Sequence, residues 1–96
     1  MLMLITYDVS TINPAGRKRL RRVAKACLDY GQRVQNSVFE CEVDPAQWAA
    51  LRGRLVSEIK IEEDSLRFYR LGADGKRRVE HVGAKPVTDL EGPLLF

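Results

Sequence analysis

Apolar residues recur along the chain with two periods, one typical of strands and one typical of helices. Residues 1–9 form a short apolar run ending in Tyr-Asp-Val, as expected for a strand buried on both faces in the middle of a sheet. Asn13 and Pro14 then begin a helix, because Asn13 can cap free amides and Pro14 already has a helical φ. We expect this helix to end at Gly31, and its apolar positions have helical spacing: Leu20, Val23, Ala24, Cys27 and Leu28.

The same strand and helix signals repeat after the first helix. Residues 33–43 predict two short strands separated by a bend at residues 36 and 37, the second with apolar residues at alternate positions. Asp44 and Pro45 repeat the cap and proline signal, so they open a second helix. Its apolar stripe consists of Trp48, Leu51, Leu55 and Ile59.

Two further strands complete the pattern. Residues 65–71 are rich in strand formers, Asp74-Gly75 is a hairpin turn signal, and residues 78–83 supply a last strand. The order β-α-β-β-α-β-β predicts an α+β fold, a ferredoxin-like βαββαβ unit with an additional C-terminal strand. This fold places both helices on one sheet face, and a second copy of the chain is the simplest cover for the other. We therefore predict a homodimer, with the extra strand as the candidate for pairing across the dimer edge.

The length of 96 residues allows one domain with one core. We place this domain at residues 1–84 and a tail at residues 85–96, where prolines and a glycine disfavour regular structure. The tail ends in Leu94, Leu95 and Phe96. Such an apolar end either folds back on its own sheet or docks on a partner.

Composition is that of an ordinary soluble domain, with 45% hydrophobic and 30% charged residues. The first apolar run is interrupted at Thr6 and no basic region precedes it, so we expect a cytoplasmic protein without a signal peptide or membrane association. Cys27 and Cys41 lack the spacing of a zinc site and are expected to be buried thiols rather than a disulfide. The single histidine, His81, is expected to be structural or merely exposed.

Positive charge is concentrated in the first predicted helix, although the net charge is only +3. Turning its apolar stripe toward the sheet leaves an exposed arc with no acid before Asp29, formed by Arg17, Lys18, Arg21, Arg22 and Lys25. Such an arc can follow the phosphates of a nucleic acid, and Arg33 could extend its footprint. The alternative is an ordinary solvated helix face.

Asp8 is the candidate catalytic and metal-binding residue. It lies at the carboxyl end of the predicted central strand, and carboxylate oxygens suit Mg²⁺, with Mn²⁺ as the alternative ion. One carboxylate is a poor site, but a twofold axis near the strand end would bring two copies of Asp8 together. The competing interpretation is an acid that only hydrogen-bonds the loop that follows it.

Several segments resemble one family of CRISPR-associated proteins, the second core protein, Cas Two, and in particular its short members from type I systems. The resemblance is carried by residues 3–9 (Met-Leu-Ile-Thr-Tyr-Asp-Val), by Gly16-Arg17 with Arg19, Leu20 and Val23, and by residues 31–41 and 64–71. The segment Arg-Val-Gln-Asn-Ser-Val-Phe-Glu at residues 33–40 is the most specific of these.

The resemblance implies a ferredoxin-like homodimer with a metal between the paired Asp8 carboxylates. It also implies a role in spacer acquisition, in which the dimer grips duplex DNA between two dimers of the CRISPR integrase, Cas One. Members of this family are described as metal-dependent ribonucleases or deoxyribonucleases, so the expected nucleic-acid partner is double-stranded DNA, with single-stranded RNA as the alternative.

Three functions follow from these observations. The first is a metal-dependent endonuclease at Asp8, and the second is a non-catalytic DNA-binding scaffold that bridges the integrase dimers. The third is a regulatory domain that binds a metabolite, since the ferredoxin-like fold hosts many functions. The basic helix and the absence of a glycine-rich ligand loop favour the first two.

Overall fold

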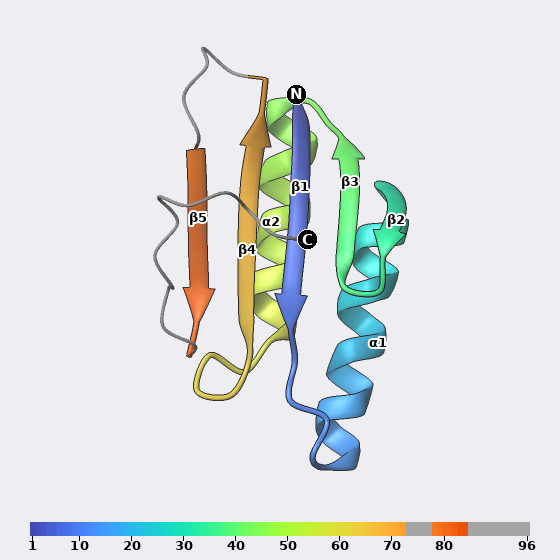
Figure 1. Cartoon of the computed structure of the whole chain (residues 1–96), viewed down its shortest axis with the longest axis vertical. Helices are drawn as coiled ribbons and strands as arrows, with labels where there is room; N and C mark the ends of the chain where they lie inside the picture. Colours follow the sequence, from blue (N-terminus) through green and yellow to red (C-terminus); the bar gives the residue numbers. More distant parts are fainter. Residues whose placement is uncertain (73–77, 85–96) are drawn as a thin grey trace.

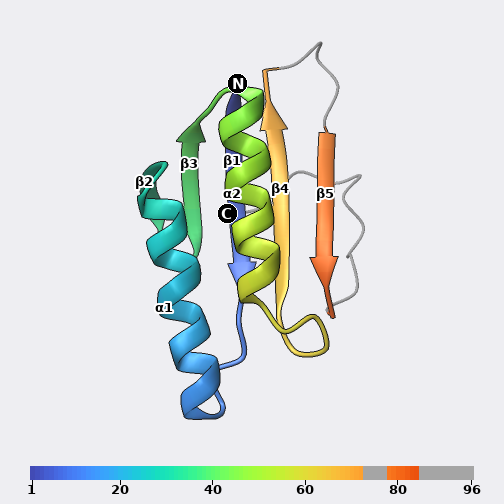
Figure 2. The ribbon, with the colours of Figure 1, turned by 180° about the vertical axis from the view of Figure 1, so that it is seen from behind.

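The computed structural model describes residues 1–72 and 78–84. They form one antiparallel five-stranded sheet with two helices on one of its faces (Figures 1 and 2). The strands are β1 (Leu2–Asp8), β2 (Gly31–Gln35), β3 (Val38–Glu42), β4 (Ser65–Leu71) and β5 (Arg78–Gly83), and the helices are α1 (Pro14–Leu28) and α2 (Pro45–Glu58).

The sheet order confirms the predicted ferredoxin-like topology with one added strand. The strands lie in the order β2-β3-β1-β4-β5, so β1 is central and pairs with β3 and β4. The additional strand β5 pairs antiparallel with β4 of the same chain. Pairing of β5 across a dimer edge, the division at residue 84 and the Asp74-Gly75 turn stay predictions, the last because it lies outside the described residues.

Both helices begin where the cap and proline signals place them. The Asn13 side chain accepts a hydrogen bond from Gly16 N at 2.9 Å. Asp44 and Gln47 form a reciprocal capping box, with bonds of 2.7 and 2.9 Å. These contacts satisfy amides that have no partner in the first helical turn.

The predicted end of the first helix was wrong. The helix ends at Leu28 and is followed by Asp29 in an ordinary right-handed conformation, while Gly31 is the first residue of β2. Gly31 is required there for close packing, because a Cβ at this position would lie 2.1 Å from Glu40 O.

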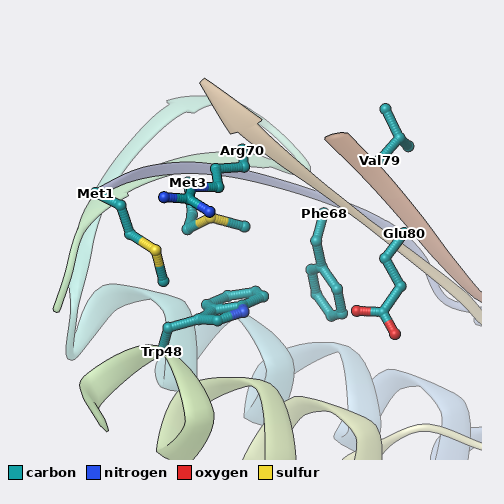
Figure 3. A pocket seen from close by; sticks show the side chains of 7 residues that line it. All are labelled: Met1, Met3, Trp48, Phe68, Arg70, Val79 and Glu80. Atoms are coloured by element: carbon teal, nitrogen blue, oxygen red, sulfur yellow. The ribbon is translucent and has the colours of Figure 1, made fainter. Parts of the chain in front are cut away.

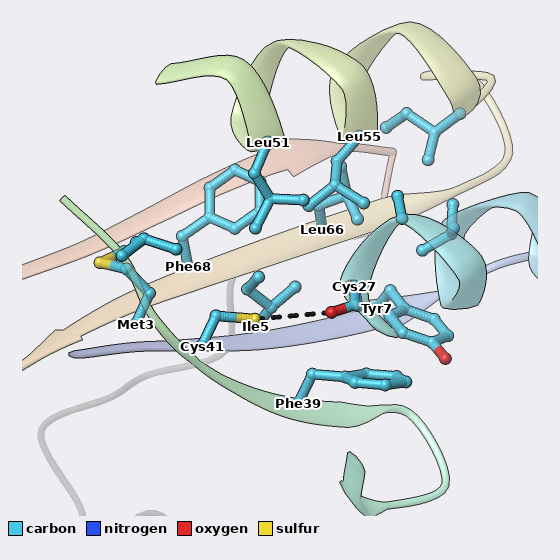
Figure 4. Close-up of a cluster of buried hydrophobic side chains, with 14 of the residues drawn as sticks. Met3, Ile5, Tyr7, Cys27, Phe39, Cys41, Leu51, Leu55, Leu66 and Phe68 are labelled. Atoms are coloured by element: carbon cyan, nitrogen blue, oxygen red, sulfur yellow. Dashed lines mark hydrogen bonds between the residues drawn. The ribbon is translucent and has the colours of Figure 1, made fainter. Parts of the chain in front are cut away.

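The core lies between the helices and the sheet (Figure 4). Alternate residues of the inner strands supply Met3, Ile5, Tyr7, Phe39, Cys41, Leu66 and Phe68, and the helices supply Val23, Ala26, Cys27, Leu51 and Leu55. Leu28, which the spacing placed in the stripe, is instead 51% exposed at the end of its helix.

The two cysteines are free and buried, as predicted. Cys41 Sγ lies 3.8 Å from Cys27 O. Burial raises the pKa of Cys27 to about 12 and that of Cys41 to about 11, so both remain protonated thiols near neutral pH.

Candidate metal and nucleic-acid site

Asp8 is the last residue of β1, and its side chain is exposed. It pairs in register with Ser65 of β4. Side chains alternate along a strand, and Tyr7 belongs to the core on the helix side, so Asp8 lies on the opposite sheet face. The strand end where Asp8 lies is also the end from which the chain continues into α1 (Figure 1).

The carboxylate chemistry of Asp8 fits a hard divalent cation, but the described residues of one chain supply too few ligands. Within residues 1–72 and 78–84, no group of three or more His, Cys, Asp or Glu side chains could hold a metal ion. A site at Asp8 therefore needs oxygen ligands from outside this part of the chain, such as a second copy of Asp8.

The predicted basic arc is exposed on α1. Arg17, Lys18, Arg21, Arg22 and Lys25 all have exposed side chains. Lys25 Nζ donates to Asp29 Oδ1 at 2.7 Å, and Asp29 also accepts from Arg54 Nη1 at 2.8 Å. The charge of Lys25 is thus partly compensated, while the described residues provide no ion pair to the four cations nearer the helix start.

Arg33 lies away from the start of α1, on strand β2. It is exposed on β2, which packs beside α1 (Figure 2), and its guanidinium carbon lies 5.0 Å from the Phe39 ring centroid. Tyr7 OH donates to Asn36 O at 3.4 Å, and burial raises the pKa of Tyr7, so the phenol stays protonated. The Arg33 guanidinium therefore packs against an aromatic ring of the core, on the helix side of the sheet, whereas Asp8 lies on the opposite face.

His81 is partly buried on β5 and pairs in register with Arg67 of β4. Both ring nitrogens, and Nε and Nη2 of Arg67, are buried without a hydrogen-bond partner in the described residues. His81 therefore has no acid-base partner in that part of the chain. The Arg67 guanidinium lies 5.4 Å from the Tyr69 ring centroid.

One ion pair was missed from the sequence. Arg19 Nε donates to Asp64 Oδ2 at 2.8 Å, and the Asp64 side chain is completely buried. In the sequence, Arg19 is one cation among six in a run and Asp64 is one acid in another cluster. The available signal was helical spacing: Arg19 lies four residues before Val23 and eight before Cys27, both on the buried face of α1.

A shallow pocket lies at the other end of the sheet (Figure 3). Its walls are Met1, Met3, Trp48, Phe68, Arg70, Val79 and Glu80. The rings of Trp48 and Phe68 pack edge to face with their centroids 4.9 Å apart, and Glu80 accepts a hydrogen bond from Arg52. The pocket lies where β1 begins and Asp8 where β1 ends, so the two do not form one site.

Comparison with known proteins identifies the family. The model of the family described as CRISPR associated protein Cas2 matches residues 1–79. The chain belongs to the Cas2 family. This confirms the resemblance found in the sequence.

Several Cas2 relatives match over all or nearly all of their lengths. The CRISPR-associated endoribonuclease Cas2 of Nitratidesulfovibrio vulgaris is 67% identical over 96 residues, covering all of this chain and 94% of that protein. The CRISPR-associated endonuclease Cas2 of Halalkalibacterium halodurans is 64% identical over the whole of both chains. The prediction of an enzyme agrees with the names of these relatives.

A solved Cas2 structure confirms the fold. The crystal structure of Streptococcus pyogenes Cas2 at pH 6.5 is 61% identical and superposes with a TM-score of 0.71, covering 77% of this chain and 89% of that chain. Within the described residues, no helix is long and apolar enough to cross a membrane.

Proposed function

We propose that this chain acts in CRISPR spacer acquisition as a homodimeric, metal-dependent endonuclease that cuts phosphodiester bonds at paired Asp8 carboxylates. The observation that carries this proposal is the position of Asp8 at the end of the central strand, exposed and on the sheet face without helices. The endonuclease and endoribonuclease names of relatives at 64% and 67% identity support it.

The dimer follows from the two faces of the sheet. Met3, Ile5 and Tyr7 point to the helices, so Leu2, Leu4, Thr6 and Asp8 form the alternate set on the other face. Two copies that meet across this face, around a twofold axis near the end of β1, bring their Asp8 side chains together. Pairing supplies a second carboxylate beside Asp8.

The two Asp8 carboxylates would hold Mg²⁺ or Mn²⁺ through oxygen ligands. When bound, either ion polarises a phosphodiester oxygen and makes a water molecule more acidic. The protein's own part is to place the carboxylates and to hold the substrate backbone. Arg17, Lys18, Arg21 and Arg22 would contact phosphates of double-stranded DNA or single-stranded RNA, with Lys25 and Arg33 extending the surface. The expected place of action is the cytoplasm.

A second function is favoured by the contrast between abundant exposed cations and a single candidate metal-binding carboxylate, Asp8, in the described residues. In this alternative the dimer is a non-catalytic DNA-binding scaffold between dimers of the CRISPR integrase, Cas One. The tail residues Leu94, Leu95 and Phe96 would dock on the integrase; they lie outside the described residues.

The two functions are separated by nuclease assays of the wild type, Asp8→Ala and Glu62→Gln. Glu62 is an exposed carboxylate and provides the matched control. Labelled single- and double-stranded DNA and RNA are incubated with Mg²⁺, Mn²⁺ or a chelator. The endonuclease proposal predicts metal-dependent cleavage that is lost in Asp8→Ala and kept in Glu62→Gln, with nucleic-acid binding retained in both. Cleavage by Asp8→Ala, or in excess chelator, would contradict it, and salt-sensitive duplex binding without cleavage would favour the scaffold.

A further inference from the structure

The buried carboxylate of Asp64 joins segments from both halves of the candidate site. Its Oδ1 accepts hydrogen bonds from Ser10 N at 3.0 Å and Arg19 Nη2 at 3.3 Å. Its Oδ2 accepts from Arg19 Nε at 2.8 Å and Lys60 N at 2.9 Å. Each oxygen thus has two donors, and the carboxylate is saturated although it is removed from water.

These donors lie close in sequence to the residues of the proposed function. Ser10 follows Asp8 by two positions, and Arg19 follows Arg17 by two positions on α1. Asp64 also directly precedes Ser65, the register partner of Asp8. One side chain therefore contacts the segment that leaves the carboxylate site and the helix that carries the cations.

The connection between strand and helix is tightly packed around the same point. Val9 is buried, and a Cβ on Gly16 would lie 1.9 Å from Ser10 O. The first turn of α1 therefore rests directly on the backbone that Asp64 holds. Gly83 is packed similarly from the other side, since its Cβ would lie 2.0 Å from Asp64 O. A shift of Ser10 must consequently move the start of the basic helix.

We propose that Asp64 and Arg19 are positioning residues, which fix the Asp8 carboxylate relative to Arg17 and Lys18 so that both act on one nucleic-acid strand. This inference rests on the proposed function for the role of Asp8 and the cations. Both would act through the backbone and the helix that they hold together, and not by touching the metal or the phosphates. Arg19 differs from its neighbours on α1 because its side chain is 14% exposed and already paired.

The Arg19–Asp64 pair, called the brace from here on, is tested by Arg19→Lys, which keeps the charge and removes the forked donor pair. Asp64→Asn is the second variant, because it keeps the size and removes two acceptor sites. Arg52→Lys is the matched control: Arg52 forms the same kind of forked pair with Glu80, but between α2 and β5.

Hydrogen exchange of the amides of residues 10–16 is the first measurement. We expect at least about tenfold faster exchange in Arg19→Lys and none of this change in Arg52→Lys. Equal exchange in Arg19→Lys and the wild type would overturn the proposal.

The second measurement asks whether the brace matters for the site. Mn²⁺ affinity, followed by paramagnetic broadening of the NMR signals of residues 7–10, and duplex affinity are compared far below the unfolding temperature. Both should weaken about tenfold in Arg19→Lys, whereas Arg17→Gln should weaken duplex affinity alone. Lower thermal stability with unchanged affinities would show a merely structural pair and would overturn the positioning role. If the wild type binds no Mn²⁺ at Asp8, the proposed metal site fails, while the exchange and duplex measurements still decide the brace.

Discussion

The two helices begin with the same device and present different surfaces. Each has a capping side chain followed by proline, Asn13 with Pro14 in α1 and Asp44 with Pro45 in α2. The buried face of α1 consists of small residues such as Val23 and Ala26, whereas α2 buries large aliphatic side chains. Packing thus anchors α2 more strongly than α1. Of the two helices, α1 carries more of the exposed charge.

The cations of the two helices also differ in their partners. Arg52 and Arg54 of α2 are paired with Glu80 and Asp29 from other elements. The α1 segment contains no acid, and its cations near the helix start have no ion pair in the described residues, Arg19 excepted. A count of charges along the sequence cannot separate these cases, because the partners of α2 come from distant positions. Unpaired cations on one helix are what make α1 the candidate phosphate-binding surface.

The largest effect is expected at the pair of Arg19 in α1 with the completely buried Asp64. Asp64→Asn removes the negative charge and one acceptor oxygen from the buried side of the Arg19 pair and should lower the free energy of unfolding by about 3–5 kcal/mol. Burial by itself raises the pKa of Asp64, but Arg19 and the amides of Lys60 and Ser10 outweigh it and lower the pKa overall.

The same lowered pKa gives a pH dependence with a definite sign. The carboxylate stabilises the fold above its unfolded pKa of about 3.9, and this stabilisation is lost as the pH falls through the lower folded value. Urea unfolding at pH 7 and between pH 4 and 2 measures both effects. The difference in stability between wild type and Asp64→Asn should shrink as the pH falls, and a constant difference would show that the pair is not the cause.

A matched leucine pair tests the difference in packing. Leu55 of α2 is completely buried, so Leu55→Ala should cost about 2–5 kcal/mol of unfolding free energy through lost contacts and a cavity. Leu28→Ala at the end of α1 should change it by less than about 0.5 kcal/mol, because that side chain is 51% exposed. Denaturant unfolding of both variants compares them directly. Equal losses would mean that Leu28 packs on something, such as a second copy.

The difference in charge pairing is tested by two double variants. Arg21→Gln with Arg22→Gln removes two unpaired cations of α1, and Arg52→Gln with Arg54→Gln removes two paired cations of α2. If each α1 cation neutralises one phosphate, the slope of log affinity against log salt should fall by about 1.8 for duplex DNA. The double variant of α2 should keep the wild-type slope of log affinity against log salt. Fluorescence titrations at several salt concentrations measure this, and equal slopes for both variants would rule out α1 as the phosphate surface.

Most of the fold was predictable because local signals agree with the tertiary structure. Strand bounds at residues 65–71 and 78–83 follow from composition and turns, and the caps at Asn13 and Asp44 fix both helix starts. The end of α1 was not predictable from Gly31, because that glycine is required by the backbone of a neighbouring strand. A contact between two strands of the sheet does not change the local pattern of apolar and polar residues.

The residues of the candidate site were predictable, but the contacts that hold them in place were not. The strand-end position of Asp8 and the exposure of the α1 cations follow from periodicity, so both were found. The pair of Arg19 with Asp64 joins positions 45 residues apart and was not visible in the charge pattern. Whether two copies of Asp8 meet depends on surfaces between chains, which the periodicity within one chain does not specify.

The smallest effect concerns the caps themselves. Asn13→Ala and Asp44→Ala each remove a side-chain acceptor from a first-turn amide, and each should cost about 1 kcal/mol of unfolding free energy. Only Asn13 lies in the connection between Asp8 and the basic helix, so only Asn13→Ala should also weaken duplex binding. Thermal unfolding and DNA titration of the two variants give both quantities. If Asp44→Ala weakened DNA binding as much, global loosening rather than the local position of α1 would set affinity, and the functional contrast between the helices would fail.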